Sequence, residues 1–302
     1  MALSPQRKPD LTGLSICSGV GGLDLGLHLA EPGYRAVGYV ERNAYCASTL
    51  VARMADKALA DAPIWDDLKT FDGRPWRGKV SVVTGGYPCQ PFTLSGRRLG
   101  EDDPRHLWPD VRRIVGEVAP EWVFFENVIG HLSLGFQDVA GDLQSMGFRV
   151  AACVTSAAEV GAGHIRERHF ILGHANVQDG RQSLHARPHE RASAVQACTQ
   201  PEGLTIGASD AGDQLVSALD CAQNGGMGGS ALPIFAPPPG DFSSWHRALQ
   251  QRPELEPCLH GLDHGMADRV ERSAAAGNGV APMAAAWAWR YLKNSFGCQF
   301  SV

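Results

Sequence analysis

The sequence predicts an α/β fold in which helices cover both faces of a Rossmann-like, mostly parallel sheet, with a smaller irregular domain attached. Two patterns predict the sheet: strand-like and helix-like segments alternate through the first 173 residues, and a glycine-rich turn joins the first strand to the first helix. The loss of long periodic runs after Gly173 predicts the irregular domain. A composition of 44% hydrophobic and 20% charged residues excludes a disordered or collagen-like chain.

Short runs rich in valine, isoleucine or aromatic residues, bounded by glycine, proline or polar residues, are predicted to be strands. They are Gly13–Cys17, Arg35–Val40, Val80–Thr84, Trp122–Glu126, Phe148–Thr155 and His169–Gly173. Helices are predicted at Leu23–Ala30, Ala44–Leu59, Leu107–Val118, Phe136–Met146 and Pro282–Asn294. Alternation of this kind favours parallel strands joined by helical crossovers.

Residues 175–262 lack the long periodic runs that the preceding part of the chain contains. They contain a glycine cluster at 225–229 and the Pro-Pro-Pro-Gly run at 237–240, which are typical of loops and turns. The segment is therefore either a loop-rich linker or a small recognition domain with few regular elements. The remaining residues, 11–174 and 263–302, are predicted to form one larger domain.

Net charge, cysteine spacing and the length of the apolar runs argue against several classes of protein. The net charge of −5 gives no overall attraction to nucleic acid, although a local basic cleft can still act within an acidic protein. The eight cysteines contain no CxxC pair, which excludes a zinc ribbon and argues against a disulfide framework. No apolar run approaches the ~18 residues of a membrane span, and the polar start is unlike a signal peptide. We therefore expect a soluble, cytoplasmic protein without a metal.

The first chemical motif is the turn Cys17–Gly22, between a predicted strand and a predicted helix. Glycines there let the backbone approach a ligand and leave the helix N-terminus free to face it. Glu41 follows the end of the second strand, where a carboxylate can accept hydrogen bonds from ribose hydroxyls, and the pair Asp67-Leu68 can meet an adenine edge. A tight turn alone would explain the glycines, but with Glu41 an adenosine-type cofactor is favoured.

Two further motifs follow predicted strands. Cys89 lies in the Gly/Pro-rich loop 85–96 after Val80–Thr84, where open α/β sheets place active sites. Glu126-Asn127-Val128 ends an otherwise apolar strand, and an acid there is costly to bury without a partner or a function.

Together these segments resemble the DNA (cytosine-5) methyltransferases of bacteria and phages, a family that uses S-adenosylmethionine. The loop around Pro88-Cys89-Gln90, followed by Glu126-Asn127-Val128, is the most specific part of the resemblance. His164–Arg168 resembles the family's Gln-x-Arg-x-Arg motif, and Gly277–Val280 resembles its terminal Gly-Asn-Ser-Val motif. Cys17, His164 and Gly279 depart from the family's usual aromatic, glutamine and serine.

The resemblance implies a methyltransferase that modifies cytosine in double-stranded DNA, sequence-specifically and as a monomer, with a cognate restriction endonuclease as a possible partner. It implies that the Cys89 thiolate adds to C6 of a flipped cytosine, that protonated Glu126 bonds N3, and that Arg166 and Arg168 polarise the ring. Residues implied to bind S-adenosylmethionine are Cys17, Gly19, Val20, Gly21, Gly22, Glu41, Arg42, Asp67, Leu68, Gly86, Pro88, Leu107, Asn278, Gly279 and Val280. Residues implied to bind DNA are Gln90, Ser95, Arg97, Arg98 and Arg105, with 175–262 as the target-recognition domain.

Three other functions compete with this interpretation. A tRNA cytosine-5 methyltransferase of the same fold shares the cysteine and Glu-Asn-Val motifs, but typically carries a Cys-Phe-Thr tripeptide that is absent here. A Rossmann NAD-binding oxidoreductase would leave Cys89, Glu126 and Asn278 without a role. A catalytically silent DNA-binding module would not need the pair Cys89 and Glu126.

Overall fold

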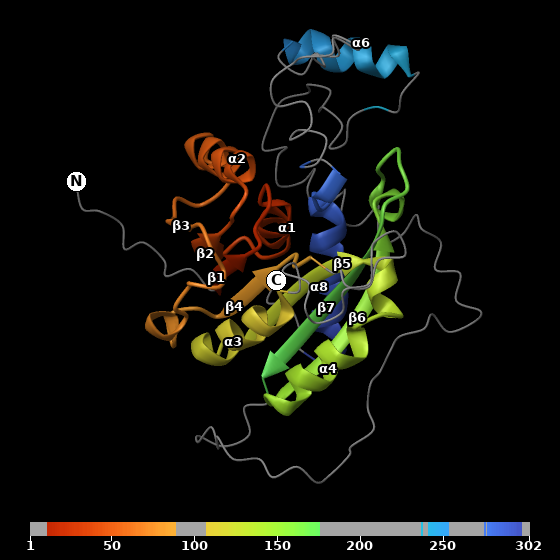
Figure 1. Cartoon of the computed structure of the whole chain (residues 1–302). Coiled ribbons are helices and arrows are strands. Elements are labelled where there is room, and N and C mark those ends of the chain that lie inside the picture. Colours follow the sequence, from red (N-terminus) through yellow and green to blue (C-terminus); the bar gives the residue numbers. More distant parts are fainter. Residues whose placement is uncertain are drawn as a thin grey trace, which may run out of the picture.

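A computed structural model describes residues 11–88, 107–175, 241–253 and 277–297, together with the single residues 237 and 275. Its centre is a seven-stranded sheet of order β3-β2-β1-β4-β5-β7-β6 (Figure 1). The strands are β1 Leu11–Ile16, β2 Tyr34–Val40, β3 Ile64–Trp65, β4 Val82–Gly85, β5 Trp122–Val128, β6 Phe148–Ser156 and β7 Glu167–Ala175. Each predicted strand is present, and β3 is an additional one.

The sheet is mostly parallel, as predicted. Strands β3, β2, β1, β4 and β5 run parallel to their neighbours, whereas β7 is antiparallel to both β5 and β6. Strand β7 begins at Glu167, two residues before the predicted start, so that Arg168 lies opposite Val128 in the β5–β7 ladder. The carboxyl ends of the parallel strands therefore meet the start of β7 at one edge of the sheet.

The helices agree with the predicted ranges, with one correction. They are α1 Gly22–Ala30, α2 Ala44–Ala55, α3 Trp108–Val118, α4 Phe136–Ser145, α6 Phe242–Gln251 and α8 Pro282–Ser295. The prediction that the second helix continues to Leu59 was wrong: it ends at Ala55, and Lys57 adopts a left-handed φ of 61° that a helix cannot accommodate. Helix α6 lies in the segment expected to contain few regular elements, and the Asp241 side chain caps it by accepting from the Ser244 N–H at 3.1 Å.

Both faces of the sheet are covered, as expected for this fold class. One core cluster joins Leu27 of α1 and Trp289 of α8 to Phe124 of β5, while the other joins Ile114 of α3 and Leu143 of α4 to Phe125, the next residue of that strand. Neighbouring residues of a strand point to opposite faces, so β5 contributes to both clusters. In Figure 1, α3 and α4 lie on the opposite side of the sheet from α8.

The C-terminal helix α8 returns to pack against α1. At Gly26 an added Cβ would lie only 2.6 Å from the Cβ of Ala285, so the two helix backbones approach closely there. The indole of Trp289 donates to Glu31 at 2.9 Å, just past the end of α1. This packing brings the segment before α8, residues 277–280, against the glycine turn. Within the ranges described above, no helix has both the length and the apolarity needed to cross a bilayer.

Candidate functional site

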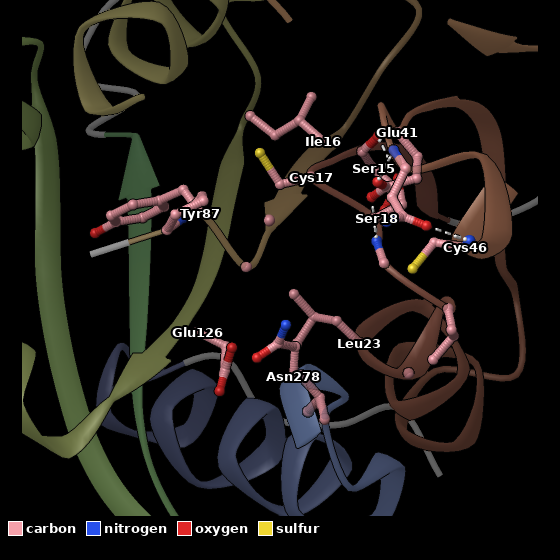
Figure 2. A pocket seen from close by; sticks show the side chains of 18 of the residues that line it. Ser15, Ile16, Cys17, Ser18, Leu23, Glu41, Cys46, Tyr87, Glu126 and Asn278 are labelled. Carbon is pink, nitrogen blue, oxygen red and sulfur yellow. Dashed lines mark hydrogen bonds between the residues drawn. The ribbon is translucent and has the colours of Figure 1, made fainter. Parts of the chain in front are cut away.

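A cavity of about 740 Å³ opens at the carboxyl ends of β1, β2, β4 and β5 (Figure 2). Open α/β sheets bind their ligands at this edge. In Figure 2, Glu126 and Asn278 lie on one side of the cavity and Glu41 on the other. Segments that are distant in the sequence therefore line one cavity large enough for a small-molecule cofactor.

The structure brings most of the predicted cofactor residues to this cavity. Those lining it are Cys17, Gly19, Val20, Gly22, Glu41, Arg42, Asp67, Leu68, Gly86, Pro88, Leu107, Asn278, Gly279 and Val280. Gly21 does not line it: this residue directly precedes α1 with a φ of 79°, and a Cβ added there would meet Leu59 at 2.6 Å. Glu126 and Arg168 also line the cavity, whereas Arg166 does not. Cys89, Gln90, Ser95, Arg97, Arg98 and Arg105 lie outside the described residues.

The glycine turn lies between β1 and α1. A Cβ added at Gly22 would lie 2.5 Å from the carbonyl oxygen of Val280, so only glycine permits the C-terminal segment to lie this close. A Cβ added at Gly19 would meet no atom within 4 Å, because the turn leaves open space at that point. The turn therefore contacts the C-terminal segment on one side and leaves room for a ligand on the other.

Glu41 holds the turn in place. One of its carboxylate oxygens accepts from the N–H of Gly19 at 2.7 Å, and the other accepts from the N–H of Asn43, also at 2.7 Å. Each oxygen retains acceptor capacity for a further donor, because a carboxylate offers about four lone-pair sites. The same side chain can therefore shape the turn and receive the hydroxyl groups of a ligand.

Glu126 and Arg168 form a buried ion pair at the opposite side of the cavity. The Arg168 Nε lies 2.8 Å from Glu126 Oε1, and the two side chains are only 16% and 8% exposed. Burial raises the pKa of Glu126 from 4.5 to about 7, against the opposing effect of the positive charges of Arg168 and Arg166. The carboxyl group can therefore carry a proton near neutral pH and donate it in a hydrogen bond.

Arg166 faces the C-terminal segment. Its guanidinium donates to the backbone carbonyl oxygens of Gly277 and Gly279, on either side of Asn278. Both hydrogen bonds come from Nη2, so one terminal nitrogen of the guanidinium holds this segment. Arg166 directly precedes β7 and therefore links this strand to the segment 277–280 rather than lining the cavity.

None of the three cysteines in the described ranges is suited to act as a nucleophile. Burial, together with the carboxylates of Glu41 and Asp110, raises the pKa of Cys17 to about 12. Burial likewise raises the pKa of Cys46, and Cys153 is buried in β6 away from the cavity. A thiolate is the reactive form, so these three are poor nucleophiles. Cys89, the predicted nucleophile, lies outside the described residues. Over the same ranges, no three histidine, cysteine, aspartate or glutamate side chains group as a metal site would require.

The sequence did not indicate the buried carboxyl group of Asp24. It is fully enclosed and accepts from the Ser15 and Tyr34 hydroxyls, each at 2.6 Å, and from the Thr84 hydroxyl at 3.3 Å. These contacts join α1 to β1, β2 and β4 directly beneath the glycine turn, and burial raises the pKa of Asp24. The sequence feature that could have indicated this buried carboxyl group is the presence of a polar residue within an apolar helical repeat. His131 and His169, both buried, were missed as well.

Sequence comparisons identify related proteins. The family described as C-5 cytosine-specific DNA methylase matches residues 11–206. Type II methyltransferase M.NgoMIV of Neisseria gonorrhoeae is 31% identical over 169 residues, which cover 55% of this chain and 52% of that protein. Type II methyltransferase M.AquIA of Picosynechococcus is 31% identical over 178 residues, which cover 53% of this chain and 70% of that protein. The chain thus matches about half the length of the first relative.

Solved structures with a similar fold include a putative DNA modification methyltransferase from an Escherichia coli prophage. It is 26% identical, with a TM-score of 0.46 over 55% of this chain and 47% of that one. The S. pombe Dnmt2 methyltransferase is 23% identical, with a TM-score of 0.46 over 58% of this chain and 53% of that one. The family match itself covers well over half of the 302 residues. The chain therefore belongs to the family of C-5 cytosine-specific DNA methylases.

Proposed function

We propose that this protein is a DNA (cytosine-5) methyltransferase, which transfers a methyl group from S-adenosylmethionine to C5 of a cytosine flipped out of duplex DNA. The observation that carries the proposal is the buried pair of Glu126 and Arg168, which lines the same cavity as the glycine turn. A carboxyl group with a pKa of about 7 at this position is suited to donate a hydrogen bond to a base.

The cavity has groups that match S-adenosylmethionine. The open space at Gly19 can receive the ligand beside the N-terminus of α1, and Glu41 is available for the ribose hydroxyls. Leu68, which is buried and lines the cavity, offers an apolar contact for adenine, while Asp67 offers an acceptor. When bound, S-adenosylmethionine supplies an electrophilic methyl group.

The chain's own residues supply the activation of cytosine. The Cys89 thiolate forms a bond from sulfur to C6 of the base, while the Glu126 carboxyl donates to N3, where negative charge develops. Arg168, held beside Glu126, presents its fixed positive charge to the same ring. After C5 has gained the methyl group, loss of the C5 proton and cleavage of the bond to Cys89 restore the aromatic ring.

The proposal is tested by incubation with tritiated S-adenosylmethionine and two substrates, duplex DNA amplified without methylation and bulk tRNA. Label recovered as 5-methyldeoxycytidine from the DNA supports it. Label confined to the tRNA would identify the RNA-modifying alternative, and label in neither would contradict methyl transfer. We also propose that the enzyme works as a cytoplasmic monomer in a bacterial restriction–modification system or as a phage or orphan modification enzyme.

We further propose that residues 175–262 form the target-recognition domain and that residues 11–174 and 263–302 form the catalytic domain. Candidate base-reading or phosphate-binding arginines are Arg181, Arg187, Arg191, Arg247 and Arg252. Of these, Arg247 is exposed on α6, where its guanidinium donates to the Ser244 hydroxyl at 3.1 Å.

Exchange of residues 175–262 for the corresponding segment of a relative should change the methylated site and preserve methyl transfer, because the predicted catalytic residues lie outside the segment. Bisulfite sequencing of methylated DNA reads the site directly. Truncation of one base-reading arginine should cost roughly 1–3 kcal/mol of discrimination. An active chimera that still modifies the original site would refute the assignment.

Replacing Cys17 with phenylalanine should tighten S-adenosylmethionine binding by up to about tenfold, equivalent to 1.4 kcal/mol. The thiol lines the cavity, where an aromatic side chain would give adenine a broader apolar contact. The rate of methyl transfer should barely change, because such a contact is equal in the ground and transition states. Calorimetric titration of both proteins decides the matter. Unchanged or weaker binding by a folded Cys17→Phe variant would show that phenylalanine overpacks the turn.

A further inference from the structure

A chain of buried polar side chains runs behind the catalytic edge of the sheet. The hydroxyl of Tyr87 lies 3.3 Å from Nε2 of His131, and Nδ1 of His131 lies 3.5 Å from Nδ1 of His169. The three residues are only 4%, 2% and 0% exposed. Within the described part of the protein, Nε2 of His169 has no hydrogen-bond partner.

Each member of this chain adjoins a segment that carries a proposed catalytic residue. Tyr87 follows β4 and is separated from Cys89 by Pro88 alone. His131 lies in the short helix η4, Ile129–Leu132, directly after β5, whereas His169 follows Arg168 in β7 and pairs with Asn127. These three side chains thus connect three segments that must keep a fixed mutual geometry during catalysis.

Asn127 provides a second link between the same segments. Its side-chain amide donates to the carbonyl oxygen of Tyr87 at 3.1 Å. Tyr87 is therefore held at its backbone by the residue after Glu126 and at its hydroxyl by His131. The side-chain and backbone contacts of Tyr87 together define the direction in which the polypeptide backbone leaves β4 toward Pro88.

Packing alone does not account for the polar atoms of this chain. The Tyr87 ring packs against Trp108 and Phe125 at centroid distances of 5.3 and 5.7 Å, and His169 packs edge-on against Phe136 at 4.7 Å. Phenylalanine at position 87 would retain its ring contacts without the cost of burying a hydroxyl group. Buried polar groups of this kind specify a unique arrangement when they are paired.

Both imidazoles are neutral at physiological pH. Burial lowers the pKa of His131 to about 4, and burial together with the neighbouring His131 lowers the pKa of His169 to about 4. With one proton per ring, one Nδ1 can donate to the other, whereas protons on both would face each other. The three side chains therefore add no positive charge beside Glu126, and Arg168 is the closest cationic partner of Glu126.

We propose that Tyr87, His131 and His169 are positioning residues that set the path of the Tyr87-Pro88 segment relative to Glu126, and that methyl transfer depends on this path because Cys89 is the next residue in the sequence. This inference rests on the proposed methyl transfer. Tyr87 lines the cavity, but its side chain is 4% exposed and its hydroxyl lies on His131, and neither histidine lines the cavity. Removal of these polar groups should therefore lower the rate of the chemical step and leave S-adenosylmethionine affinity unchanged.

The test is a double-mutant cycle of Tyr87→Phe and His131→Leu. Single-turnover methylation of amplified, unmethylated genomic DNA is measured with tritiated S-adenosylmethionine, and rates are expressed per cofactor site counted by titration. Each single variant should lose about tenfold or more in rate constant, because small displacements of reacting groups have large effects. The dissociation constant for S-adenosylmethionine should stay within twofold. The double variant should be no slower than the slower single variant.

Two further variants separate positioning from general stability. Tyr39→Phe removes another buried tyrosine hydroxyl, which donates only weakly to the Ala60 carbonyl at 3.4 Å, and should retain the wild-type rate. His131→Gln places an amide where Nε2 lay and should recover most of the lost rate. A Tyr87→Phe rate equal to that of Tyr39→Phe, or losses that multiply in the double variant, would overturn the inference. Absence of methyl transfer by the wild type would instead overturn the proposed function.

Discussion

Replacement of Cys89 by alanine should abolish methyl transfer to DNA while leaving S-adenosylmethionine binding intact. Without the thiolate no bond forms to C6, and C5 of cytosine remains too weak a nucleophile to accept the methyl group. Cys17 cannot take over the role, because its pKa of about 12 keeps it protonated, and burial raises the pKa of Cys46 as well. Tritium incorporation into DNA and calorimetric titration with S-adenosylmethionine measure the two properties separately.

The matched control for this variant is Cys153→Ala. Cys153 is buried in β6 and does not line the cavity, so its loss should leave the rate of methyl transfer close to that of the wild type. Substantial turnover by Cys89→Ala would show that another group is the nucleophile. Equal inactivation of both variants would point to a loss of folding.

Replacement of Glu126 by glutamine should reduce the rate of methyl transfer by roughly 10²–10⁴-fold, the usual contribution of a positioned general acid. In the proposed mechanism the wild-type carboxyl group, which is protonated below its pKa of about 7, donates to N3 of the base. As pH rises through 7 the proton is lost, so the pH profile of kcat/KM for the wild type should have a descending limb near pH 7. The glutamine variant cannot ionise and should lack this limb.

The same substitution should also alter how the stability of the protein depends on pH. Because the folded-state pKa of Glu126 is raised from 4.5 to about 7, its contribution to stability is fully present below pH 4.5 and is lost as pH rises to 7. The stability of Glu126→Gln relative to the wild type should therefore increase by about 3 kcal/mol across this range. Urea unfolding at several pH values measures the difference.

Glu121→Gln is the control for both measurements. Glu121 directly precedes β5, at the opposite end of the strand from Glu126, and its carboxylate is about half exposed. Its substitution should change neither the descending limb nor the pH dependence of stability by a comparable amount. A limb that persists in Glu126→Gln would show that another group titrates near pH 7.

The alternation of strand and helix was sufficient to predict the sheet, but not its complete order. Strand β3 is only two residues long, Ile64–Trp65, and forms by pairing with Tyr39 and Val40 rather than from its own pattern. The antiparallel insertion of β7 between β5 and β6 likewise depends on tertiary pairing. Local patterns identify segments, whereas the neighbours of a strand are chosen by the whole sheet.

The part of the candidate cavity formed by the glycine turn and Glu41 could be predicted, because turns and strand ends carry local signals. Glycines after β1 and an acid after β2 stand out in the sequence, and both reach the cavity. The buried contacts behind the site gave no comparable signal. Asp24 meets Thr84 across sixty positions, and His131 meets His169 across thirty-eight, so these partners are defined only by the fold.

The most direct test of the proposed mechanism is covalent trapping on DNA in which 5-fluorocytosine replaces cytosine. Fluorine cannot leave C5 as a proton does, so the bond between Cys89 and C6 should persist after methyl transfer. Trypsin releases Cys89 in the peptide 80–97, where it is the sole cysteine, and mass spectrometry can locate the adduct. We expect a methylated fluorocytosine nucleotide on this peptide. An adduct on another cysteine, or no adduct from an enzyme that methylates ordinary DNA, would contradict the mechanism.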